Sequence, residues 1–174
     1  MGTITDLIDE PLSAEGLAAR FRELCDDPRF ANLPGKIELD VWGRIVMSPG
    51  SNLHGMLQAR LVQRLAVLGG QAFAEASVTT PAGVLVADVA WGSPAFVAAH
   101  RTETPFRRAP ELCIEIASPS NSRKALNEKV SAYLAAGAVE VWLVHPGSRR
   151  IECLGPDGAL AATRFAVDLD GLFD

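Results

Sequence analysis

The stretch IEIASPSNSRKALNEKVSAY, from Ile114 to Tyr133, begins as a buried strand and ends as a helix. Glu115 stands between two isoleucines, in a segment that otherwise has the apolar character of a protein core. An ionised carboxylate in such surroundings is strongly unfavourable unless a positive group meets it. Lys129 on the predicted helix, a bound cation, or both together would supply that charge.

The pattern on either side of this stretch predicts one α/β domain. Apolar residues at helical spacing indicate helices over 13–26, 53–70 and 121–137. Apolar or alternating runs bounded by turn residues indicate strands over 37–42, 44–48, 72–80, 84–91, 111–118, 139–145, 149–155 and 159–165. The connections over 27–35 and 92–110 are predicted to be irregular. We expect residues 1–36 to form an N-terminal helix and loop, and residues 37–174 the core of the domain.

Composition is typical of a globular protein with one core. The chain has 174 residues, of which 48% are hydrophobic and 21% charged. Its three cysteines and three histidines are scattered without CxxC or HxxxH spacing, which argues against a disulfide framework and a thiolate metal site. The amino end lacks the pattern of a secretory signal, and no apolar run is long enough to span a bilayer. We therefore expect a cytoplasmic protein with no membrane partner.

The acidic balance of the chain limits how it could bind nucleic acid. The formal net charge is −5 and the pI is about 5.2. A protein that binds nucleic acid through a broad basic surface has the opposite balance. Any phosphate chemistry must therefore depend on a local site, with a cation that neutralises the phosphate.

Three carboxylates in predicted strands are candidates for such a site. Asp88 lies in the apolar run VLVADVAW, and Glu115 occupies a similar position in ELCIEIAS. Two neighbouring strands that each offer one acid would suit a hard divalent cation such as Mg²⁺. Glu38 is a third acid, but Asp40 shares its strand face, and alternation alone does not choose between them. For a single isolated acid, an edge-strand residue that faces solvent or a structural ion pair is the better interpretation. Asp88 and Glu115 together, followed by a lysine, favour the metal site.

Lys129 is the candidate cation within the chain. It lies two turns into the predicted helix, on a stripe with Ala125 and Tyr133 that borders the apolar face. A long side chain at such a border can reach over the sheet edge toward Glu115. Pairing with Glu128 or Glu140 on the surface is the alternative.

These segments together resemble the Uma2 family of restriction-endonuclease-like proteins, within the PD-(D/E)xK nuclease superfamily. The resemblance runs from IELDVWGRIVMSP, through a helix that contains His54-Gly55 and the strand VLVADVAW, to PELCIEIASPSNSRKALNEKVSAYLAAGAVEVWLVHP. It covers most of the chain, from Glu38 to the strand after Arg149. It implies a restriction-endonuclease-like α/β fold, with a mixed β-sheet flanked by helices.

The resemblance also implies roles for the acids. Asp88 and Glu115 match the two metal-binding acids of the superfamily, and the backbone carbonyl of Ile116 would complete the set of Mg²⁺ (or Mn²⁺) ligands. Glu38 matches the upstream acid of the family, which resolves the ambiguity with Asp40. It would hold a second metal ion or orient a water molecule.

Lys129 matches a lysine that has moved from the usual strand position onto the following helix. The strand position itself, two residues after Glu115, is Ala117 here, and the proline that usually precedes the aspartate is replaced by Ala87. Any activity would therefore depend on Lys129 reaching the site from the helix. Tyr133 and His54 match positions with supporting roles.

The activity implied by this resemblance is metal-dependent hydrolysis of DNA phosphodiester bonds by Glu38, Asp88, Glu115 and Lys129. A homodimer is expected as well, because paired active sites suit cleavage of both strands. The alternative is a catalytically inert, nuclease-like scaffold that binds nucleic acid or another protein. A third possibility is a purely structural α/β protein whose acids form surface ion pairs.

Overall fold

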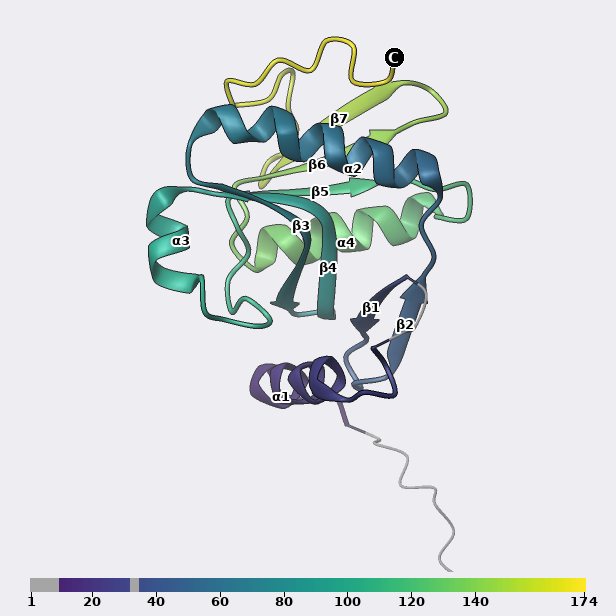
Figure 1. The fold of residues 1–174 in the computed structure, drawn as a ribbon, viewed down its shortest axis with the longest axis vertical. Helices are drawn as coiled ribbons and strands as arrows, with labels where there is room; N and C mark the ends of the chain where they lie inside the picture. Colours follow the sequence, from purple (N-terminus) through teal and green to yellow (C-terminus); the bar gives the residue numbers. More distant parts are fainter. Residues whose placement is uncertain (1–9, 32–34) are drawn as a thin grey trace, which may run out of the picture.

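The computed structural model describes residues 10–31 and 35–174. The strands form one mixed sheet, and the helices pack around it (Figure 1). The helices are α1 (Ala14–Asp26), α2 (Asn52–Leu65), the 3₁₀ turn η1 (Ala66–Leu68), α3 (Pro94–His100) and α4 (Arg123–Ala135). The strands are β1 (Lys36–Leu39), β2 (Ile45–Ser48), β3 (Gln71–Thr80), β4 (Gly83–Gly92), β5 (Leu112–Ile116), β6 (Glu140–His145), β7 (Arg150–Gly155) and β8 (Gly158–Ala159).

The sheet has a fork at β4. Its order is β2-β1-β4-β5-β6-β7-β8, and β3 forms a hairpin with β4 along nearly its whole length. Because β3 covers one edge of β4, both β1 and β5 must pair with the other edge. There β1 pairs only through Leu39 with Val84, and β5 pairs only with Val89 to Trp91. The β4 backbone between these two points lies where the neighbouring strands diverge.

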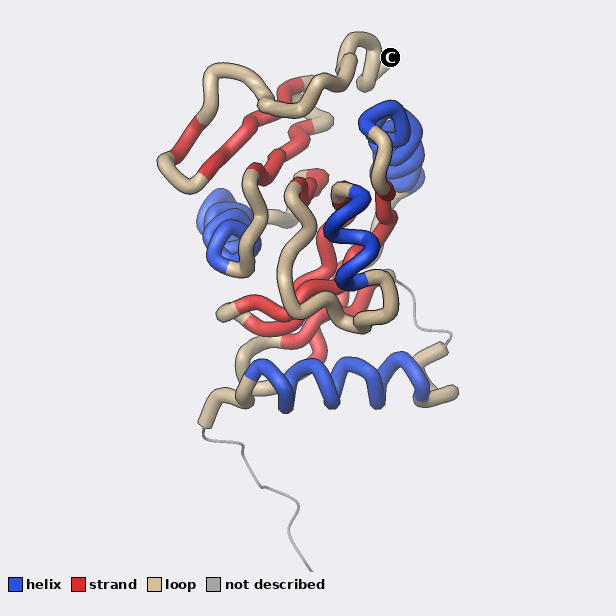
Figure 2. Tube along the Cα trace, turned by 90° about the vertical axis from the view of Figure 1, so that its left-hand side faces the viewer, coloured by secondary structure: helices blue, strands red, loops and turns tan. Residues whose placement is uncertain are grey.

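The two faces of the sheet have separate cores, with α2 and α4 on opposite sides (Figure 2). Helix α2 buries Leu57, Leu61 and Leu65 against β5 and β6, and the C-terminal segment adds Leu172 to this core. Helix α4 buries an apolar stripe, including Leu126 and Val130, against the other face. Because each helix is fixed by its apolar face, the polar residues beside that face are also held at a fixed position relative to the strands.

Helix α1 packs on a third, smaller core. Leu17, Phe21 and Leu24 lie against Leu39 of β1 and against the start of β4. The Ser13 hydroxyl caps this helix by accepting a hydrogen bond from the N–H of Gly16. The N-terminal helix therefore holds β1 beside β4, at the root of the fork.

Strands β3 and β4 lose their regular alternation at Glu75 and Asp88. Ala87 and Ala90 both face the α4 core, although they are three residues apart and a regular strand would turn them to opposite faces. Glu75, the residue that would oppose Asp88 in the β3–β4 register, has a φ of 55°. Such irregularities re-aim side chains and are common beside functional sites. This one lies at Asp88, where the alternation of side chains along β4 shifts by one residue.

Most predicted elements are confirmed within one or two residues, but two predictions are wrong. The connection predicted as irregular over 92–110 contains α3, which Ser93 caps and Pro94 begins. The strand predicted over 159–165 ends at Ala159. Beyond it Phe165 packs edge-on against Trp91, so the segment covers the α2 core instead of pairing in the sheet.

Residues 1–9 of the predicted N-terminal region, and residues 32–34 of the predicted loop over 27–35, lie outside the described residues. Within the described part of the chain, none of the helices combines the length and the apolar character needed to cross a membrane.

The junction of β1 and β4 yields a prediction about Gly83, which has a φ of 121° and whose added Cβ would collide with the carbonyl oxygen of Leu39. Gly83→Ala should lower the free energy of unfolding by about 1–3 kcal/mol, measured by urea denaturation. The matched control is Gly55→Ala in the exposed part of α2, where no atom lies within 4 Å of the new Cβ. That change should stabilise the protein by up to about 1 kcal/mol. Equal effects at both glycines would contradict this account of the junction.

Candidate active site

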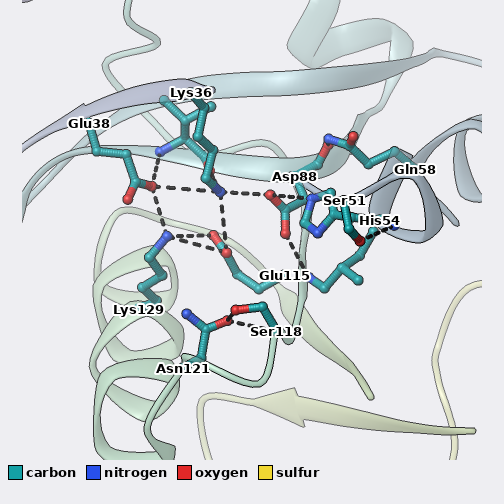
Figure 3. Close-up of polar contacts among 12 residues, drawn as sticks. Lys36, Glu38, Ser51, His54, Gln58, Asp88, Glu115, Ser118, Asn121 and Lys129 are labelled. Carbon is teal, nitrogen blue, oxygen red and sulfur yellow. Dashed lines mark hydrogen bonds and ion pairs between the residues drawn. The ribbon is translucent and has the colours of Figure 1, made fainter. Parts of the chain in front are cut away.

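The fork in the sheet is filled by charged side chains instead of a strand (Figure 3). The N–H of Val86 donates a hydrogen bond of 2.8 Å to Oε1 of Glu38, and the carbonyl of Val86 accepts one of 2.8 Å from Nζ of Lys36. Both side chains come from β1, two residues apart and therefore on one face of the strand. They satisfy the backbone groups of β4 that the diverging strands leave without a partner.

Lys36 contacts all three carboxylates of the site. Its Nζ lies 2.7 Å from Oδ1 of Asp88, 3.5 Å from Oε2 of Glu115 and 3.9 Å from Oε1 of Glu38. Its side chain is only 10% exposed. Three acids from three different strands thus converge on one buried ammonium group.

Lys129 reaches the same group of acids from α4. Its Nζ lies 2.8 Å from Oε1 of Glu38 and 3.3 Å from Oε2 of Glu115. Tyr133, one turn further along the helix, donates a hydrogen bond of 2.7 Å to Oε1 of Glu115. Helix α4 therefore supplies both a positive charge and a hydroxyl group to the carboxylate that the sequence places between two isoleucines.

Asp88 is held by groups from α2 and β5. Its Oδ2 accepts a hydrogen bond of 2.7 Å from the N–H of Ile116, and its Oδ1 lies 3.2 Å from Nε2 of His54. The side-chain amide of Gln58, one turn after His54, donates to the backbone carbonyl of Asp88 at 3.0 Å. Gln58 thus takes the place of a strand partner where the alternation of β4 breaks. The position of this carboxylate is fixed from three directions.

A cavity of about 820 Å³ opens beside these residues. Lys36, Asp88, Glu115 and Lys129 line it, and the polar loops 48–51, 117–121 and 145–148 form much of its wall. Glu38 is buried behind the two lysines and is not among the lining residues. A ligand in the cavity would therefore meet Asp88, Glu115 and the lysines before it met Glu38.

Burial alone would raise the pKa of Asp88. Hydrogen bonds from His54, from Lys36 and from the N–H of Ile116, together with the charge of Lys36, outweigh burial and lower the pKa to about 2. The carboxylate is consequently ionised throughout the physiological range. It is available as a hard oxygen donor.

Burial has the larger effect on Glu115. It raises the pKa of this carboxyl above the usual value, although the charges of Lys36 and Lys129 act in the opposite direction. Burial and the charge of Glu115 also raise the pKa of the Tyr133 hydroxyl well above its usual value, so that this group remains a hydrogen-bond donor. Burial would lower the pKa of Lys36, but the attraction of Glu115, Asp88 and Glu38 exceeds this effect and raises it.

The donor set fits a divalent cation in its chemistry. Mg²⁺ takes oxygen ligands and commonly uses only one or two protein carboxylates. Asp88 and Glu115 are two such carboxylates at the cavity wall, and Ile116 lines the same wall. Among the described residues, no three His, Cys, Asp or Glu side chains gather closely enough to hold a metal ion by themselves. The residues thus fit a divalent cation that takes part of its ligands from the protein and the rest from water or substrate.

The structure brings together the four residues singled out from the sequence. Glu38, Asp88, Glu115 and Lys129 are connected through direct contacts or through Lys36. Asp40 instead accepts hydrogen bonds from the backbone of the β1–β2 turn.

Lys129 takes neither of the surface pairings considered as alternatives. Glu128 lies 3.8 Å from Lys124, and the buried Glu140 is bound by Nε1 of Trp142. Lys129 therefore points toward the buried acids, as the sequence predicted.

Two residues of the site were missed by the sequence analysis. Lys36 lies two residues before Glu38, so strand alternation alone would have placed both side chains on one face. Gln58 lies four residues after His54, at the spacing that puts two side chains on one face of a helix. The signals were present, but neither residue interrupts an apolar run in the way that Asp88 and Glu115 do.

Comparisons with known proteins agree with this fold. The model of the Uma2 family, described as "Putative restriction endonuclease", matches residues 18–171. A crystal structure from Anabaena variabilis, described as "a putative nuclease belonging to DUF820", matches with a TM-score of 0.62 and 20% sequence identity, over 94% of this chain and 98% of that chain. No curated protein matches the sequence. The expected α/β fold, a mixed sheet flanked by helices, is confirmed.

The low pKa of Asp88 yields a prediction about stability and pH. The folded value of about 2 lies below the usual 3.8, so the stabilisation from ionised Asp88 is complete above about pH 4 and is lost as the pH falls through 2. The advantage of the wild type over Asp88→Asn in urea denaturation with EDTA should therefore shrink by about 2 kcal/mol between pH 4 and pH 2. Asp157→Asn, at an exposed turn, should follow the wild type. If the difference in free energy of unfolding between the wild type and Asp88→Asn stayed constant from pH 4 to pH 2, the low pKa of Asp88 would be contradicted.

Proposed function

The chain belongs to the Uma2 family, as its motifs predicted, and we propose that it is a metal-dependent endonuclease that hydrolyses phosphodiester bonds in DNA. The observation that carries the proposal is the convergence of three buried carboxylates and two lysines beside one cavity. A structural protein has no physical need for such a cluster, because buried charges weaken a fold unless each is fully compensated. The description of the family as restriction endonucleases supports the same class of reaction.

In this proposal Asp88, Glu115 and the backbone carbonyl of Ile116 hold Mg²⁺ or Mn²⁺. When bound, the cation would activate water and stabilise the charge that develops on the phosphate. His54 and Gln58 orient Asp88, and Tyr133 orients Glu115. The acids are thus pre-positioned by neighbouring side chains, of which His54 and Gln58 also line the cavity.

Lys129 has the role of a fixed positive charge at the cavity wall. Its side chain is 22% exposed, so its ammonium group is within reach of a phosphate in the cavity. A charge that is already in place where negative charge accumulates lowers the barrier without reorganisation. Glu38 keeps this ammonium group in position through the contact of 2.8 Å. The buried position of Glu38 favours this positioning role over the role of a metal ligand that the resemblance implies.

A local site of this kind would allow a protein with a negative net charge to bind DNA. The net charge of −5 gives no broad basic surface, but the lysines at the cavity act at short range, where screening by salt is weakest. We also propose that the protein is cytoplasmic, where DNA would be accessible to it.

The test of activity is cleavage of supercoiled plasmid in the presence of Mg²⁺ or Mn²⁺. Asp88→Asn and Lys129→Met should each lower the rate by about 100-fold or more, because each removes a group that acts on the transition state. Lys124→Met is the matched control, since Lys124 lies on the same helix and is 87% exposed. It should cut like the wild type. Circular dichroism would establish that each variant is folded.

Thermal unfolding separates an enzyme from an inert scaffold. A cation that binds only the folded protein raises the apparent unfolding temperature, and Mn²⁺ should do so for the wild type and not for Asp88→Asn. Intact plasmid with every divalent metal and every form of DNA, together with no thermal effect of Mn²⁺, would favour the scaffold that binds nucleic acid or protein without cutting.

We propose that the protein also forms a homodimer, so that two sites can act on the two strands of DNA. Large apolar side chains at the edge of the sheet and at the start of α2 support this, namely Met47, Leu53 and Met56, which are 38%, 54% and 51% exposed. Sedimentation equilibrium should give twice the mass of the chain. Leu53→Glu combined with Met56→Glu should shift the protein toward the monomer, whereas Val67→Glu, at another exposed apolar position, should not.

A further inference from the structure

Lys36 is the most enclosed positive group of the site, and neither the resemblance nor the proposed reaction assigns it a role. Its ammonium group donates to Oδ1 of Asp88 at 2.7 Å and to the carbonyl of Val86 at 2.8 Å. It also lies 3.5 Å from Oε2 of Glu115, so one nitrogen atom stands between the two acids that are the candidate metal ligands (Figure 3). A cation bound by the same two oxygens would need the space that this ammonium group fills.

The choice of lysine at this position has a chemical meaning. The chain has 13 arginines and only three lysines, and two of the three lysines are Lys36 and Lys129. A lysine ammonium is a compact point charge on a flexible stem, whereas the broad, planar guanidinium of arginine forms fixed bidentate pairs. A site that exchanges one small cation for another requires the first kind of group.

We propose that Lys36 is an internal counter-ion that compensates the acids before metal binds, and that it leaves Asp88 and Glu115 when a divalent cation takes its place. The inference rests on the metal dependence proposed above. It makes Lys36 a competitor of the metal ion, while Lys129 remains beside Glu115 and Glu38. The wild-type affinity for the cation is then set partly by the work of moving Lys36.

The charges of the cluster favour an exchange over a simple addition. Glu38, Asp88 and Glu115 contribute three negative charges when ionised, and the two lysines compensate two of them. A divalent cation added to both lysines would leave a net positive charge in a buried site. A divalent cation together with Lys129 alone balances the three carboxylates. Buried charge that is left uncompensated is costly, so the balanced arrangement is the more stable one.

The surroundings of Lys36 allow its side chain to move. The residue lines the cavity, so an ammonium group released from Asp88 has open space next to it. Its strand is joined to β4 only at Leu39, three residues away, so no regular pairing with β4 holds Lys36 itself. The released charge would remain at the wall of the cavity, where it meets a phosphate group.

Calorimetric titration of Mn²⁺ into metal-stripped protein tests the exchange. Lys36→Met removes the competing charge with little change in length, and should bind Mn²⁺ about 10-fold more tightly than the wild type, or more. Lys36→Arg keeps the charge and should bind no more tightly than the wild type. Lys124→Met is the control for loss of a lysine far from the acids, and should bind like the wild type. Equal or weaker binding by a folded Lys36→Met protein would overturn the inference.

A second measurement uses the wild type, in case Lys36→Met does not fold. With ¹⁵N-labelled lysine the ammonium region of the NMR spectrum holds three side-chain signals, and Lys36→Arg identifies the one from Lys36. Saturating Mg²⁺ should shift this signal and leave that of Lys124 in place. An unchanged Lys36 signal in the metal-saturated protein would overturn the inference, as would failure of both the wild type and a folded Lys36→Met protein to bind either cation.

These measurements separate the inference from the proposed activity. If Lys36→Met binds Mn²⁺ more tightly but neither protein cuts any nucleic acid, the exchange is supported and the endonuclease function fails. If the wild type cuts plasmid with metal while Lys36→Met binds Mn²⁺ no more tightly, the function is supported and the exchange is overturned.

Discussion

Strand β4 has β3 along one edge, but on its other edge it pairs with β1 only at Leu39 and with β5 only from Val89 to Trp91. The backbone between these points would be buried without partners, and an unpaired buried peptide group is costly. Glu38 and Lys36 supply the missing hydrogen bonds to Val86. The divergence of the two strands therefore accounts for one acid and one lysine at the fork, where Asp88, Glu115 and Lys129 also converge.

The contacts within this cluster also fix the positions of the three carboxylates before any ligand binds. Each acid is held by groups from neighbouring elements: Asp88 by α2 and β5, Glu115 by α4, and Glu38 by β4 and α4. The helices are themselves fixed by the separate cores on the two faces of the sheet. Packing on both faces thus determines the distances between the charged groups at the fork.

Much of this arrangement could be predicted from the sequence because the informative residues interrupt an apolar pattern. Asp88 and Glu115 each interrupt an apolar run, so they were predicted to lie on neighbouring buried strands. In the structure the two acids are adjacent to the Val89–Ile114 pair of the β4–β5 register. Lys129 followed from helical spacing. Lys36 stands at the start of a short strand, next to a predicted loop, where a lysine is usually exposed to solvent. Its burial depends on the fork, and a fork is a property of strand pairing that local patterns do not encode.

The irregularities of the fold were beyond prediction for a related reason. The shift of alternation at Asp88 arises from the joint distortion of two strands, with φ of 55° at Glu75, and β-propensity does not report on it. Helix α3 begins at a proline that also resembles a loop signal, and the run after Ala159 is apolar because it covers the α2 core. The shift at Asp88 and the course of the chain after Ala159 are decided by contacts between residues distant in the chain, whereas α3 begins at the local signal of Ser93 and Pro94. The site depends most on such contacts, because a buried charge is tolerated only where several elements meet to compensate it.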